Sequence, residues 1–124
     1  MVEESYVSFE TARLLKEKGF AGECDWYYPK DGWEIEQLDL YELNYCRESF
    51  IEAPSLALVM RWLREVHDIH LEVGFTFYKD GGYYVVPILT TTGQTLPYKY
   101  IDKYHSSYED AVEAAIKYCL ENLI

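Results

Sequence analysis

The stretch "HLEVGFTFYKDGGYYVVPIL", residues 70–89, decides the fold. Polar and apolar residues alternate along its first half, which is typical of a half-buried strand with one apolar face: Leu71, Val73, Phe75 and Phe77. The turn "KDGG" then reverses the chain into "YYVVPIL", where Pro87 indicates a bulge or a sheet edge. The stretch therefore predicts an antiparallel hairpin, and its apolar face needs a cover.

Two segments before the hairpin have helical periodicity. In "SFETARLLKEKGF", residues 8–20, Ser8 is placed to cap the N-terminus and Gly19 to end the helix in the left-handed conformation, with Phe20 folding back on Leu15. In "PSLALVMRWLREVH", residues 54–67, the proline opens the segment and an apolar stripe follows at Leu56, Val59, Met60, Leu63 and Val66. Both segments are predicted to be helices that cover a sheet.

A third helix is predicted at the C-terminal end, in "SSYEDAVEAAIKYCLENLI". Ser107 and Asp110 have a spacing like that of a capping box, with Asp in place of the usual Glu or Gln. The predicted buried stripe is Tyr108, Ala111, Val112, Ala115, Ile116, Cys119 and Leu123. Such a helix is expected to be a fixed part of the core.

The order of elements predicts an α+β fold. "YKYIDKY", residues 98–104, reads as a third strand after the hairpin, and one or two more strands are expected between Cys24 and Ala53. The predicted order is α-(β)-α-β-β-β-α. We expect a single domain over residues 1–124, with a three-stranded antiparallel sheet, extended to four or five strands if the earlier segments join it. Three helices are expected to pack mainly on one face.

Composition limits the class of protein. The chain has 124 residues, of which 49% are hydrophobic and 17% aromatic, so a packed core is expected rather than a disordered tail. The formal net charge of -11 opposes direct binding to nucleic acid or to an anionic membrane surface. The three cysteines are odd in number, and neither a signal peptide nor a membrane-spanning run is recognised, so a cytoplasmic location with free thiols is expected.

No constellation of reactive residues points to catalysis. His67 and His70 with Cys24 and Cys46 lack the close cysteine pair that structural zinc sites normally use. No nucleotide-binding or nucleophile motif is present, and Cys119 falls on the buried stripe of the last helix. We therefore predict no catalytic, cofactor-binding or metal-binding residue. A small hydrolase remains the least favoured alternative.

The segment from residue 26 to residue 45 is the candidate site, because it combines aromatic rings with carboxylates and contains a single lysine, Lys30. Aromatic rings provide contact area, and carboxylates orient a basic partner and speed its association. The predicted partner-binding residues are Trp26, Trp33, Glu34, Glu36, Asp39, Tyr41, Glu42 and Tyr45. Two alternatives stay open: the rings belong to the core and the acids only solubilise, or the carboxylates imitate a row of phosphates and occupy a DNA-binding host protein.

Two resemblances bear on function. Residues 54–124 resemble the double-stranded RNA-binding domain in topology, but the last helix begins "SSYEDAVE", with Glu109, Asp110 and Glu113 where that family uses a basic cluster. The segments "SFETARLLKEKGF", "AP" before "MRWLREVHDIH", and "SYEDAVEAAIKYCLENLI" look like a family of short uncharacterised proteins of bacteriophages, prophages and mobile elements of gut bacteria. That resemblance implies a small cytoplasmic accessory protein without a known activity. We expect a non-enzymatic interaction module whose partner is a host or phage protein with a basic surface. A homodimer is compatible with this expectation.

Overall fold

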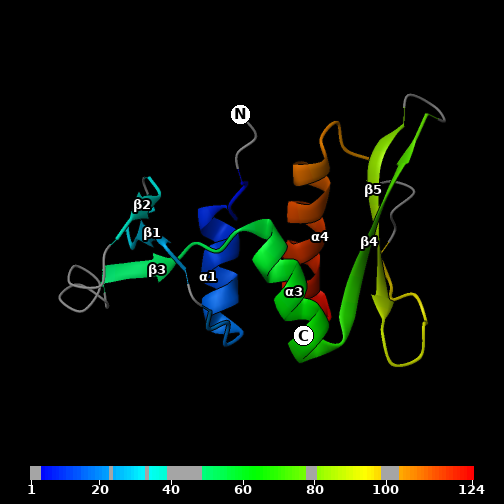
Figure 1. Cartoon of the computed structure of the whole chain (residues 1–124), viewed down its shortest axis with the longest axis horizontal. Helices are drawn as coiled ribbons and strands as arrows, with labels where there is room; N and C mark the ends of the chain where they lie inside the picture. The colour runs from blue at the N-terminus through cyan, green and yellow to red at the C-terminus, as the bar shows by residue number, and fades with distance from the viewer. Residues whose placement is uncertain (1–3, 23, 33, 39–48, 78–80, 99–103) are drawn as a thin grey trace. The chain divides into compact units, whose positions relative to one another are not determined.

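The structure is a computed structural model of the whole chain, and it describes residues 4–22, 24–32, 34–38, 49–77, 81–98 and 104–124. The chain divides into two compact units, Met1–Ser55 and Leu56–Ile124, and each has its own antiparallel sheet (Figure 1). We call them unit 1 and unit 2 and describe each by itself.

Unit 1 begins with helix α1, Phe9–Glu17, whose two ends follow the sequence prediction. The Ser8 hydroxyl accepts a hydrogen bond from the Thr11 backbone N–H at 3.3 Å, which satisfies one of the unpaired donors of the first turn. At the other end Gly19 has a φ of 82°, and the Phe20 N–H donates to the Leu15 carbonyl at 2.9 Å. This is the pairing of a Schellman motif, so a residue with a side chain at position 19 would strain the helix end.

The sheet of unit 1 has the strand order β2-β1-β3, with β1 at Trp26–Pro29, β2 at Glu36–Gln37 and β3 at Phe50–Glu52. The central strand β1 pairs antiparallel with both neighbours. Helix α1 packs on β3, and its buried residues Ala12 and Leu15 join Tyr27 and Ile51 in a small core. The N-terminal segment is tied to this unit because the Val7 N–H donates to the Pro54 carbonyl at 3.1 Å.

Unit 2 is built around the hairpin that the sequence predicts, with β4 at Ile69–Thr76 and β5 at Gly82–Leu89. The two strands pair antiparallel over their whole length, from Ile69 opposite Leu89 to Thr76 opposite Gly82. Helix α3, Leu56–His67, leads into β4 through Asp68, which has a φ of 57° and whose carbonyl accepts from the Thr90 N–H at 2.8 Å. That bond fixes the start of β4 beside the end of β5.

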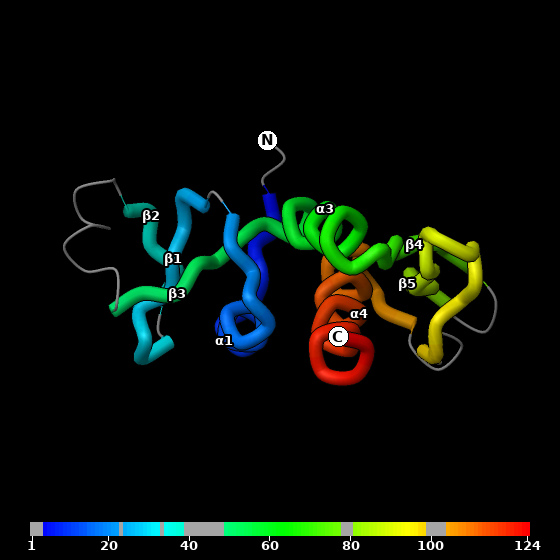
Figure 2. The backbone as a smooth tube through the Cα atoms, turned by 90° about the horizontal axis from the view of Figure 1, so that it is seen from below, coloured from blue at the N-terminus to red at the C-terminus, as the bar shows by residue number. Residues whose placement is uncertain are grey.

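Helices α3 and α4, the latter at Tyr108–Asn122, lie side by side and pack against the hairpin (Figure 2). The covered face of the sheet carries Ile69, Leu71 and Val85, which are all buried. The helices contribute a matching set of buried residues: Leu56, Val59, Leu63, Ala111, Val112, Ala115, Ile116, Cys119 and Leu120. The predicted cap of α4 is present, since the Ser107 hydroxyl accepts from the Asp110 N–H at 3.0 Å.

The chain after β5 returns beside it. Gly93 has a φ of 75° in the turn, Thr95 pairs with Ile88, and further along His105 pairs with Tyr83 in the same antiparallel sense. The predicted third strand, residues 98–104, falls mostly on 99–103, which lie outside the described residues. The two bridges show that the flanking residues line the free edge of β5.

The predicted α+β class is confirmed, with helices and antiparallel sheets in the described residues. The strands divide into two sheets because the pairs in unit 1 are closed within residues 26–52. Some residues of the predicted stripes are exposed: Val66, Phe75, Phe77 and Tyr108. Of the last helix, Leu120 is buried although it was not expected to be, since the stripe rotates slightly around the helix. A single domain over residues 1–124 stays a prediction.

Candidate partner-binding surface

The candidate site is centred on Trp26, the first residue of β1. Trp26 pairs with Gln37 across the β1–β2 ladder, and Tyr27 pairs with Glu36. The Trp26 ring is half-buried and leans on the ring of Tyr6, with 5.6 Å between the ring centroids. The indole is therefore held in place by its own unit and keeps part of its surface accessible to a partner.

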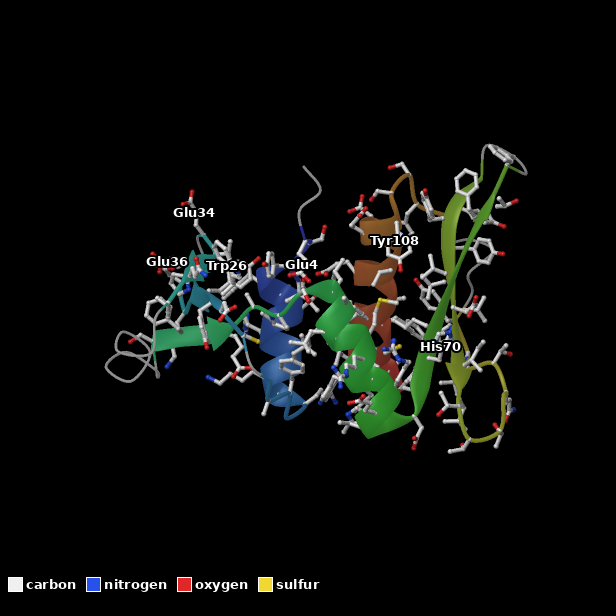
Figure 3. The ribbon with its side chains drawn as sticks, in the orientation of Figure 1. Glu4, Trp26, Glu34, Glu36, His70 and Tyr108 are labelled. Atoms are coloured by element: carbon white, nitrogen blue, oxygen red, sulfur yellow. The ribbon has the colours of Figure 1, made fainter. Side chains whose placement is uncertain are left out.

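Several exposed carboxylates come from segments that adjoin this indole, namely β2 and the residues next to Trp26 and Tyr6. Glu34 and Glu36 are exposed, and Figure 3 shows both side chains directed away from the strands of unit 1. Asp25, directly before Trp26, is also exposed, and so is Glu4, two residues before Tyr6. We call Glu4, Asp25, Trp26, Glu34 and Glu36 the acidic–aromatic surface. Like charges that share one surface raise the local negative potential, which attracts cationic groups.

Only part of the predicted site can be placed. Trp26, Glu34 and Glu36 come from neighbouring segments: Trp26 begins β1, Glu36 begins β2 and Glu34 lies just before β2. The other predicted residues lie outside the described residues: Trp33, Asp39, Tyr41, Glu42 and Tyr45.

Sequence reasoning missed Glu4, Asp25 and Tyr6. Asp25 had a local signal, because it is an acid next to a predicted site residue. Glu4 and Tyr6 had none, because their position depends on the long-range bridge between Tyr6 and Ser55. A pairing of that length leaves no pattern in a single sequence.

Unit 1 also contains a cavity of about 510 Å³ between α1 and β3. Its lining mixes apolar and polar side chains and consists of Ala12, Leu15, Lys16, Phe20, Gly22, Cys24, Tyr27, Phe50, Ile51 and Glu52. The Cys24 thiol lies 3.8 Å from a Glu52 carboxylate oxygen. Burial, followed by the charge and hydrogen bond of Glu52, raises the pKa of Cys24 to about 12. This thiol therefore stays protonated at neutral pH and lacks the thiolate character of a nucleophile.

The other reactive side chains are not assembled into a site. The His67 ring packs edge-on against Trp62, with centroids 4.6 Å apart, while His70 lies 2.8 Å from Glu72 on the uncovered face of the hairpin. Cys119 is fully buried, as predicted, and burial raises its pKa to about 12. Within the described ranges, no group of three or more His, Cys, Asp or Glu side chains could hold a metal ion.

The helices of the described residues are too short or too polar to cross a membrane. Comparison with protein families, with curated proteins and with solved structures finds no match to this chain. The case for a function rests on the residues themselves.

Proposed function

We propose that the protein is a non-enzymatic interaction module that binds a basic segment of another protein through the acidic–aromatic surface of unit 1. One observation carries the proposal: exposed Glu34 and Glu36 lie on β2 and just before it, next to the strand that begins with Trp26, whose ring packs against Tyr6. An indole fixed before binding loses little conformational freedom when a partner docks, so more of the contact free energy remains for affinity. The carboxylates add attraction at long range, which speeds association.

The chemistry of the described side chains supports a binding role over a catalytic one. Both described thiols, Cys24 and Cys119, have pKa values near 12, and no histidine is placed to activate either of them among the interactions of the described residues. A nucleophile needs a base within hydrogen-bond reach. The resemblance to short phage and mobile-element proteins fits an accessory protein, and we keep a cytoplasmic location as part of this proposal.

The experiment is affinity capture from a bacterial lysate, with each candidate partner then purified and titrated against the protein. Three forms are compared: the wild type, the double variant Glu34→Gln/Glu36→Gln, and the control Glu17→Gln/Glu121→Gln, which neutralises two exposed acids elsewhere. The proposal expects a basic partner whose association rate falls roughly tenfold or more for the first variant and stays unchanged for the control. Equal rates for all three forms would contradict it.

Adding duplex DNA to the same titration separates two kinds of partner. If the partner uses its DNA-binding face, DNA competes, and the carboxylates act as a mimic of phosphates. If DNA has no effect, the partner is recognised as a protein surface. Both results are compatible with a basic partner. Neither supports the proposal if Glu34→Gln/Glu36→Gln leaves the association rate unchanged.

A further inference from the structure

An aromatic patch lies at the end of the hairpin where β4 finishes and β5 begins, beyond the helix-covered core of unit 2. Burial falls steadily along the covered face of β4: Leu71 is 2% exposed, Phe75 is 51% exposed, and Phe77, just past the strand, is 88% exposed. Phe75 pairs with Tyr83 across the ladder, so both point to the same face as Leu71. The face that forms the core therefore continues beyond the cover that the helices provide.

The rings of this patch are in contact with one another. The Phe75 ring centroid is 4.9 Å from that of Phe77 and 4.9 Å from that of Tyr83. Tyr83 in turn meets Tyr108, the first residue of α4, at 6.1 Å, and Figure 3 shows Tyr108 at the N-terminal end of α4, between that helix and the hairpin. We call Phe75, Phe77, Tyr83 and Tyr108 the aromatic patch. Because each ring braces its neighbour, the patch is largely pre-organised for a partner.

Such a patch is unusual on a soluble surface. Contiguous exposed rings gain nothing from the hydrophobic effect while water covers them, and patches of this kind commonly mark sites of interaction. At the opposite end of the same face, Ile69 and Leu71 are covered by the helices of the unit itself. Phe75 and Phe77 are the most exposed part of this face within the described residues.

The charges beside the patch indicate what would cover it. Glu109 and Asp110 follow Tyr108 directly and are both exposed. The described residues of β4, of β5 and of the first two turns of α4 include no lysine or arginine. A guanidinium group suits this combination, because it stacks on ring faces and also forms paired hydrogen bonds with carboxylates.

We propose that the aromatic patch, with Glu109 and Asp110, is a docking surface for an arginine-containing segment of a partner protein. The arginine side chain lies over the Tyr108 ring with its guanidinium directed at the carboxylates, and neighbouring aliphatic side chains cover Phe75 and Phe77. This surface belongs to unit 2, and the inference does not depend on the acidic–aromatic surface of unit 1.

The probe is a blocked pentapeptide that alternates leucine and arginine, titrated into the full-length protein and followed by the amide shifts in ¹⁵N NMR. Two matched peptides carry lysine or the uncharged isostere citrulline in place of arginine. The inference expects shifts at the aromatic patch, with the arginine peptide binding more tightly than the lysine peptide. The citrulline peptide should bind about fivefold more weakly than the arginine peptide, since about 1 kcal/mol of cation–π attraction corresponds to that factor.

Variants make the assignment specific. Phe77→Ser removes a ring that is almost wholly exposed, so the fold should persist, and the arginine peptide should bind about fivefold more weakly because it loses an apolar contact. Val66→Ser removes an exposed apolar side chain from α3 and should leave binding unchanged. Glu109→Gln/Asp110→Asn should reduce the preference for arginine over citrulline without abolishing it, because the cation–π attraction of the rings remains.

Three results would overturn the inference. Equal binding of the arginine and citrulline peptides would show that the charge of the guanidinium group does not contribute to binding. Shifts confined to residues around Glu34 and Glu36 would assign the peptide to unit 1, and would leave the proposed function standing while this inference falls. A change of molecular mass in light scattering on Phe77→Ser, with peptide binding unchanged, would show that the patch joins two copies of the chain.

Discussion

Replacing Ile116 with alanine tests whether α4 is a fixed part of unit 2. The Ile116 side chain is fully buried in the helix face that packs on the hairpin. The substitution removes about three carbons, which costs roughly 2.4 kcal/mol of transfer free energy at ~0.8 kcal/mol per carbon. The cavity left behind adds to this cost, so a total of about 2–5 kcal/mol is expected. A loss of this size is a large fraction of the ~5–15 kcal/mol that stabilises a typical domain.

The assay is chemical denaturation followed by circular dichroism, with thermal unfolding as a second measurement. The midpoint should fall while the slope against denaturant stays the same, because the surface exposed on unfolding hardly changes. The melting temperature should drop by roughly 8–20 °C. Val66→Ala is the matched control, since Val66 is 59% exposed on α3 and its truncation should cost less than about 0.5 kcal/mol. If Ile116→Ala melted like the control, α4 would not be docked as described, and it would become a candidate for a detachable binding element.

Four further predictions follow from particular contacts. Ser107→Ala should cost about 1 kcal/mol in unfolding free energy because it removes the cap of α4, while Ser106→Ala, at an exposed neighbouring position, should cost little in the same urea titration. Gly82→Ala should lower the melting temperature, because Gly82 has a φ of 127° and a Cβ there would clash with the His105 carbonyl oxygen; an unchanged melting temperature would argue against that pairing. The pKa of the Cys119 thiol rises from 9.0 in the unfolded chain to about 12 in the folded chain, so the stability that it contributes is complete below about pH 9 and is lost as the pH rises toward 12. At pH 8, mass spectrometry should find Cys119 alkylated only when the chain unfolds. Rapid labelling of the native protein would contradict the burial of this thiol. Duplex RNA should not bind at physiological salt in a gel-shift assay, because the first turn of α4 carries Glu109 and Asp110 where a basic cluster would be needed, and micromolar binding would be inconsistent with that charge distribution.

Local signals in the sequence predicted the helices and the hairpin well. The cap at Ser8, the glycine at position 19 and the cap at Ser107 each act through contacts within a few residues, so one sequence is enough to place them. The alternation in residues 70–76 likewise predicted which residues of β4 share a face of the hairpin. These features depend on the period of the elements and on the chemistry of their ends.

Features that depend on the length of a neighbouring element were harder to predict. The alternation of β4 continues through Phe75 and Phe77, but the cover ends where α4 begins at Tyr108. The sequence pattern therefore placed both phenylalanines in the core, and the structure shows them exposed. Which residues of a face are buried is decided by its partner, and a pattern in one strand carries no information on where that partner stops.

The division of the strands into two sheets was not predicted, for a similar reason. Strands β1, β2 and β3 are short, and their pairs join residues that are up to 25 positions apart, as in Tyr27 with Glu52. Short strands carry too few residues for a period to stand out. The acidic–aromatic surface was hard to predict for the same reason, because the position of Glu4 depends on the long-range bridge between Tyr6 and Ser55.

The most direct test of the proposed function is the affinity of the captured partner, measured by titration calorimetry at low and at high salt. The account predicts a dissociation constant that weakens steeply as salt rises, because exposed charges are screened beyond about 10 Å at 0.1 M ionic strength. It also predicts that Glu34→Gln/Glu36→Gln weakens binding at low salt and loses most of that salt dependence, while Glu17→Gln/Glu121→Gln behaves like the wild type. An affinity that is independent of salt, or equal for the two double variants, would contradict the claim that this surface binds a basic partner.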